Sequence, residues 1–143
     1  MTRHELIASN RYMTLATAGA DGTPWVSPVW FAPWGDERLL WVSDPGARHS
    51  RNIAERPEIA IVVFDSTVAV GDAEALYLEA TAEQLPDEAL DAGIAAFSAH
   101  SRSGGLEPWS TEDVTAPAKH RLYCATVRRG WTLGPHDERI PLR

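Results

Sequence analysis

TPWVSPVWFAPWGDERLLWVSDPGARHSRNIAERPEIAIVVFD, residues 23–65, alternates apolar runs with short groups of turn and polar residues. Runs of four to eight apolar and β-branched residues bounded by such punctuation are typical of strands, and the more polar run after the second strand suits a short helix. The order predicts strand, tight turn, strand, helix, strand. We expect strands at 23–34, 38–43 and 59–64, a turn at Gly35-Asp36 and a helix at 47–55.

Prolines restrict the first of these strands. Residues 23–34 contain Pro24, Pro28 and Pro33. Because proline has no N–H to donate to a neighbouring strand, this segment must be bulged or lie at a sheet edge. The strand at 59–64, IAIVVF, is apolar throughout, which predicts burial on both faces.

The flanking sequence continues the same pattern. Asp21-Gly22 predicts a hairpin between the strands at 12–18 and 23–34. Residues 73–85 are rich in Ala and Glu, which by propensity alone favours a helix. Their alternation of apolar and polar positions, together with the family resemblance given below, favours a strand. A small antiparallel barrel in a single domain, 1–143, follows. The other expected elements are a helix at 2–10 with a Thr2/Glu5 capping box, a helix at 86–100, a long loop at 101–119, a strand at 120–128, a break at Gly130 and a continuation at 131–133.

Composition excludes several classes of function. The net charge of −7 argues against nucleic acid as a partner, since a phosphate backbone requires a basic surface. The N-terminal residues lack the apolar segment of a signal peptide, and no run reaches membrane-spanning length, so we expect a cytoplasmic protein. The single cysteine, Cys124, alternates with apolar neighbours and is expected in the core. The five histidines show no metal-binding spacing, so no metal site is predicted.

The start of the helix at 47–55 carries an unusual concentration of basic residues. Arg48, His49 and Arg51 fall in or beside its first turn, where the helix dipole disfavours cations. An anion bound between them would explain the arrangement, because helix N-termini with nearby arginines are ready-made phosphate sites. A solvated basic face, balanced by Asp44, Glu55 and Glu58, is the other interpretation.

The ordered segments SPVWF, WVS, ARHSRNI and RPEIAIVVF resemble the pyridoxamine 5'-phosphate oxidase-like family of flavin-binding split barrels. The resemblance covers about residues 12–85 and is weaker beyond them. It implies a mainly β fold, a six-stranded antiparallel split barrel with short flanking helices. It also implies an FMN site in which Ser43, Arg48 and His49, with Arg51 one turn on, hold the phosphate, while the backbone of Ser27, Pro28, Val29 and Trp30 contacts the ring edge.

One departure from the family pattern bears on the cofactor. His49 stands where relatives often have lysine, so phosphate affinity would depend on pH. The resemblance therefore implies an FMN-dependent oxidoreductase acting on an unidentified small molecule. A deazaflavin-dependent reductase and a non-catalytic flavin- or haem-binding protein remain open. No catalytic acid or base stands out, and the C-terminal segments HRLY and ERIPL match poorly the substrate-phosphate segment of true pyridoxamine 5'-phosphate oxidases.

The tryptophans suggest an assembly. One small barrel offers little to cover a three-ring cofactor, and Trp30, Trp34, Trp109 and Trp131 exceed what its interior can hold. Split-barrel relatives share flavin sites between subunits. We therefore expect a homodimer in which Trp131 and the tail at 134–143 of one subunit approach the cofactor of the other.

Overall fold

The computed structural model describes residues 1–143 as one antiparallel sheet with three α-helices and two short 3-10 helices. The strand order in the sheet is β2-β1-β5-β6-β7-β4-β3, and β8 pairs with the far end of β7. The elements in chain order are α1 (Arg3–Ser9), β1 (Tyr12–Ala18), β2 (Pro24–Trp30), β3 (Ala32–Trp34), β4 (Arg38–Ser43), α2 (Arg48–Glu55), β5 (Glu58–Phe64), β6 (Ala75–Gln84), α3 (Asp87–Ser103), η1 (Thr111–Val114), β7 (Arg121–Leu133), η2 (Pro135–Asp137) and β8 (Arg139–Pro141).

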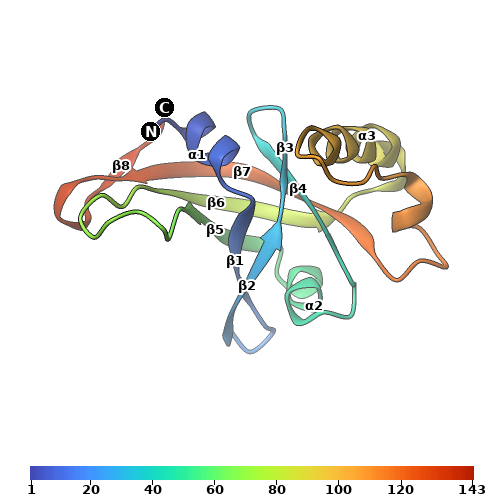
Figure 1. Ribbon diagram of the computed structural model, residues 1–143. Helices are drawn as coiled ribbons and strands as arrows, with labels where there is room; N and C mark the ends of the chain where they lie inside the picture. The colour runs from blue at the N-terminus through green and yellow to red at the C-terminus, as the bar shows by residue number, and fades with distance from the viewer.

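The sheet curls until its two margins meet. β2 and β3 form opposite margins, yet only Phe31 separates them in the chain. Because Phe31 must bridge the margins, β2 comes close to β4 and the sheet closes into a half-open barrel (Figure 1). In the same view α2 and α3 lie apart along β4, and the long β6 and β7 strands cross the molecule.

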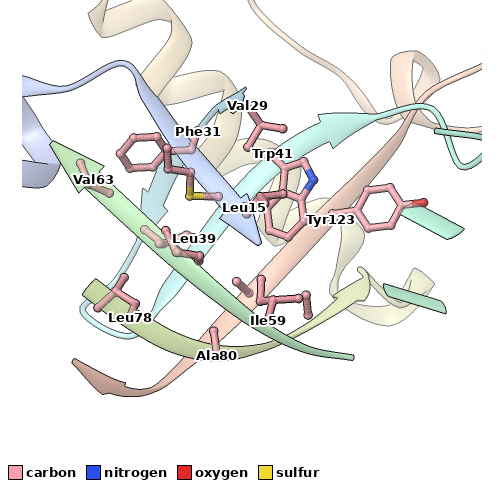
Figure 2. Packing of buried hydrophobic residues seen from close by; sticks show 14 of the residues in the cluster. Leu15, Val29, Phe31, Leu39, Trp41, Ile59, Val63, Leu78, Ala80 and Tyr123 are labelled. Atoms are coloured by element: carbon pink, nitrogen blue, oxygen red, sulfur yellow. The ribbon is translucent and has the colours of Figure 1, made fainter. Parts of the chain in front are cut away.

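The barrel interior is filled by alternate side chains of these strands. Leu15, Val63 and Leu78 are fully buried and come from three adjacent strands. Trp41 stacks on Tyr123 with ring centroids 5.8 Å apart, and Figure 2 shows the two rings side by side at one end of this core. A second, smaller cluster under α3 contains Phe97 and Cys124. The two clusters fix β4 and β7 between the barrel and α3.

Most of the local predictions are confirmed. The strand at β4, the Thr2/Glu5 capping box and the turn at Gly35 appear as expected. The proline argument also holds, because Pro28 and Pro33 lie on β2 and β3, the two strands at the margins of the sheet. Burial of Cys124 is confirmed as well.

The predicted number of strands needs correction. The sheet has eight strands where six were expected. The segment 23–34 is two strands, because the chain leaves one margin and joins the other at Phe31, and β8 adds a short strand at the end. The expected break at Gly130 is wrong: β7 runs through it, and Gly130 packs against Leu78 where a larger residue would clash.

The prediction that the strand at 59–64 is buried on both faces is also wrong. β5 alternates, with Ile59, Ile61 and Val63 facing the core and Ala60 and Phe64 exposed. An apolar outward face in one chain is an unusual feature for an exposed sheet. The helix expected at 86–100 extends to Ser103, and η1 occupies part of the expected loop. None of the helices has the combination of length and apolar character that crossing a membrane requires.

Candidate functional site

A cavity of about 740 Å³ lies between the closed margin of the barrel and α3. This volume falls in the range of about 300–1,000 Å³ that is usual for small-molecule sites. Five residues that the sequence singled out line it together. These are Pro28, Val29 and Trp30 from β2, Ser43 from the end of β4 and His49 from α2.

Ser43 and His49 form the polar part of this wall. Ser43 ends β4 and is buried, and its Oγ lies 2.8 Å from Nε2 of His49. Burial lowers the pKa of His49, because the charged imidazolium is less well solvated there. At neutral pH the ring is therefore uncharged. In the tautomer with its proton on Nδ1, Nε2 accepts the hydrogen bond from Ser43.

The helix that carries His49 begins without a capping side chain. Ala47 is the N-cap residue, and the first turn of α2 contains no acidic residue. The backbone N–H groups of Arg48, His49 and Ser50 therefore lack the usual acceptors, as at any uncapped helix start. Unpaired N–H groups, basic side chains and the Ser43 hydroxyl are all suited to an anionic group of a ligand.

Four predicted site residues lie outside the cavity wall. Arg48 has its guanidinium over the Trp25 ring, 4.3 Å from the centroid, and Arg51 is exposed one turn on. Ser27 faces Leu15 across the β1–β2 pairing. Trp131 pairs with Tyr77 near the distal end of β7, where it does not reach the cavity of its own chain. Whether these residues contact a cofactor stays a prediction.

The structure adds an aromatic wall that sequence reasoning missed. Trp30 meets Phe97 of α3 edge-on at 5.1 Å, and Phe97 meets Trp109 edge-on at 5.4 Å. His100 lies against Trp30 at 5.5 Å, and burial lowers its pKa. No sequence signal connected Phe97 with Trp109.

His120 is a second residue that the sequence analysis left without a role. It lines the cavity and immediately precedes Arg121, which pairs with Ser43 across the β4–β7 ladder. His120 therefore lies at the start of β7, close to the end of β4 that carries Ser43. No group of three or more His, Cys, Asp or Glu side chains is arranged to hold a metal ion. Cys124 is buried, which raises its pKa to about 11 and makes it a poor nucleophile.

Comparison with known proteins identifies the family. The family model described as pyridoxamine 5'-phosphate oxidase matches residues 3–134. The chain therefore belongs to this family. No curated protein matches it closely enough to report.

Solved structures agree on the fold. A haem-binding protein from Mycobacterium smegmatis is 22% identical with a TM-score of 0.72, over 96% of this chain and 54% of that one. This chain thus spans about half the length of that protein. The haem storage protein HutZ from Vibrio cholerae is 22% identical with a TM-score of 0.68, over 87% of each chain. An F420 reductase is 22% identical with a TM-score of 0.65, over 91% of this chain and 96% of that one.

Replacing Arg48 with Ala is expected to weaken FMN binding. If Arg48 holds the phosphate of FMN, as the family resemblance implies, the change removes one or two charge-assisted hydrogen bonds, each worth about 1.5–3 kcal/mol, or roughly ten- to hundredfold or more in affinity. Fluorescence titration of FMN measures the effect. Arg56→Ala removes the same charge from the far end of the helix segment and should leave affinity nearly unchanged. Equal affinities for Arg48→Ala and the unmodified protein would show that Arg48 does not hold the phosphate.

FMN affinity is expected to fall as pH rises. The pKa of His49 is lowered in the ligand-free protein, and a dianionic phosphate raises it in the complex, so binding takes up a proton. Protonation turns Nε2 into a donor and frees the Ser43 hydroxyl to donate as well. The favourable charge is present below the bound-state pKa and is lost above it.

The pH profile of FMN affinity decides this point. Dissociation constants at about pH 6 and about pH 8.5 bracket the ordinary histidine value near 6.5. His49→Gln retains a polar side chain that cannot titrate, and it also corrects for titration of the phosphate itself. Parallel profiles for the two proteins would contradict a role for His49.

Proposed function

We propose that this protein is an FMN-dependent oxidoreductase that acts on a small molecule. One observation carries the proposal: an apolar, partly aromatic cavity lies next to an uncapped helix start and the Ser43–His49 pair. The chain also belongs to the family described above. A planar ring system with an anionic phosphate needs both kinds of surface. FMN, when bound, supplies transfer of hydride or single electrons.

Different residues suit the phosphate and the ring system of the proposed cofactor. Ser43, His49 and the N–H groups at the start of α2 suit the phosphate, and Arg48 is close enough in the chain to join them. The Pro28–Trp30 segment of β2 forms a wall along which a flat ring can lie. Phe97 of α3 contacts Trp30 of this wall, and Trp109 of the loop after α3 packs on Phe97 in turn. No side chain is assigned as a catalytic acid or base.

Two features support the alternative cofactors. The cavity wall contains no Lys or Arg side chain, and His49 stands where a lysine is common in the family. A neutral imidazole holds a phosphate less strongly than an ammonium group does, and it can ligate a haem iron. A deazaflavin-dependent reductase, or a flavin- or haem-binding protein without turnover, are the second candidates.

The absorbance spectrum of the purified protein separates these functions. Flavin bands, with bleaching on reduction by a nicotinamide cofactor and recovery in air, are the expected result. A deazaflavin band, from either the reduced or the oxidised form, would show that the protein binds that coenzyme in place of FMN. A Soret band that persists, or a protein that takes up none of the three when each is added, would contradict the proposal.

We further propose that the protein works as a homodimer with its cofactor sites at the subunit interface. The outer face of the sheet is apolar over several adjacent strands. Across the strand pairings one row runs from Val26 through Ala16 to Ala60 and ends at the Glu79–Arg129 ion pair. A second row runs from Val62 through Tyr77 to Trp131. Val26 is 64% exposed in the single chain. An apolar face of this extent is typical of a surface that another subunit covers.

The outer face and the cavity adjoin. Tyr12 and Pro28 project to the outer side of β1 and β2, and both also line the cavity. A second copy seated on the outer face would therefore close the open side of the cavity. It is also the only route by which Trp131, which lies on this face, could approach a cofactor. We keep Trp131 in the proposed site on this basis.

Placing a charge on this face is expected to separate the subunits. Ala60→Glu puts a carboxylate on an exposed position of β5 beside the like-charged Glu79, where burial against a second chain is costly. Light scattering should give twice the chain mass for the unmodified protein and the chain mass for Ala60→Glu. Ala92→Glu, on the exposed side of α3, is the matched control and should remain dimeric. A monomeric unmodified protein would contradict the shared site.

A further inference from the structure

We propose that the side of the cavity built by α3 and the loop after it binds a flat aromatic substrate that carries a positive charge. This inference rests on the proposed function, since the substrate would lie beside the cofactor in the same cavity. It names the class of substrate, which neither the family nor the structural relatives specify for this chain. Three observations carry it: a fixed loop, an aromatic wall and the sign of the charge.

The loop at 104–113 is fixed by its own hydrogen bonds. Ser101, almost fully buried at the end of α3, donates from Oγ to the carbonyl oxygen of Glu107 at 2.7 Å. The backbone N–H of Trp109 donates to Oγ of Ser98 at 2.8 Å. The loop then ends in a capping box between Ser110 and Asp113. Glu107 and Trp109 are therefore held at defined places on the cavity wall, as a binding site requires.

The aromatic rings on this side leave room for another flat ring. Trp30, Phe97 and Trp109 follow one another edge to face, at interplanar angles of 87° and 78°. Phe97 itself is almost fully buried, whereas Trp30 and Trp109 are partly exposed and offer ring surface against which an aromatic ligand can pack. Leu106 also lines the cavity and is 54% exposed in the single chain. An apolar side chain that is only half covered offers surface for a ligand to bury.

The charges on the wall favour a cation. Glu107 and Asp113 are its only carboxylates, and no Lys or Arg lines it. Oδ2 of Asp113 accepts hydrogen bonds from both the backbone N–H and the hydroxyl of Ser110, so that carboxylate has a structural partner. The Glu107 side chain makes neither a hydrogen bond nor an ion pair. Glu107 is exposed, so solvent screens its charge, but a free carboxylate beside the cavity still attracts a cation and repels an anion.

The aromatic wall and the carboxylate act in the same direction. The quadrupole of a tryptophan ring stabilises a cation that lies over its face. Only Pro108 separates Trp109 from Glu107 in the loop. An aromatic ring bearing an ammonium, amidinium or quaternised ring nitrogen satisfies both. Glu107 would repel phosphate esters and carboxylates, and no nearby Lys or Arg would offset the repulsion. We therefore exclude anions as substrates bound at the α3 side of the cavity.

Three matched ligands test the proposal on the purified protein. Benzamidinium, benzamide and benzoate share one planar ring and differ in charge. Tryptophan indole N–H signals in nitrogen–proton correlation spectra report binding, with the Trp109 signal assigned from Trp109→Phe. We expect benzamidinium to bind about three- to fivefold more tightly than benzamide, as a partly exposed ion pair allows, and benzoate to bind most weakly. The Trp109 signal should shift, while that of the fully buried Trp41 should not.

Matched variants show whether Glu107 is responsible. Glu107→Gln should abolish the preference for benzamidinium over benzamide and keep the affinity for benzamide. Glu112→Gln removes a carboxylate from the same loop that does not line the cavity, and it should keep the preference. Equal binding of the three ligands, or a preference that survives Glu107→Gln, would overturn the proposal.

Repeating the titrations with FMN present separates this inference from the proposed function. Benzamidinium that binds equally well with FMN bound supports a substrate subsite beside the cofactor. Competition between FMN and benzamidinium would show that the α3 side belongs to the cofactor and would overturn the inference. If FMN fails to bind while the Glu107-dependent preference persists, the proposed cofactor is wrong and the cation subsite stands.

Discussion

The missing N–H groups of two prolines set the constraint on which this structure depends. Pro28 and Pro33 cannot donate to a neighbouring strand, so the segments that contain them must lie at sheet margins. They occupy β2 and β3, with Phe31 alone between them. The two margins of the sheet are thereby tied together by one residue, and the barrel has to close at that point. The cavity lies at this junction, which explains why Pro28, Val29 and Trp30 form its wall.

Much of the local structure follows from such short-range rules. The position of β4, the turn at Gly35 and the helix start near Arg48 depend on neighbouring residues, and the sequence predicted each of them. Five of the nine predicted site residues also meet in one cavity, because they lie on segments adjacent to the closure. The capping and turn rules apply over a few residues, and within that range they were reliable here.

The errors arise where the outcome depends on distant parts of the chain. The apolar run in β5 cannot by itself reveal whether one or both faces are covered, and in this chain only one face is. Gly130 resembles a break in the sequence, but packing against Leu78 makes it a residue that the strand requires. The meeting of Phe97 with Trp109 depends on how α3 and its loop fold back over β2 and β3. No periodicity or spacing encodes that contact.

The same burial that makes the cavity suitable for a flat ring works against its hold on a phosphate. Covering His49 lowers its pKa, so the ring is neutral in the ligand-free protein at pH 7. A lysine in that place, with an ordinary pKa of about 10.4, would stay charged through a similar loss of solvation. With histidine, the anionic ligand itself must induce the charge that binds it, by drawing a proton onto the imidazole as it enters. The uncapped N–H groups of α2 and the Ser43 hydroxyl carry no such requirement, so in the proposed FMN site they would provide the part of the phosphate interaction that does not depend on pH. A ligand with a weaker anionic group would gain only that constant part. In the proposed site, histidine at position 49 would therefore make the choice of cofactor more sensitive to the charge of the cofactor than lysine would.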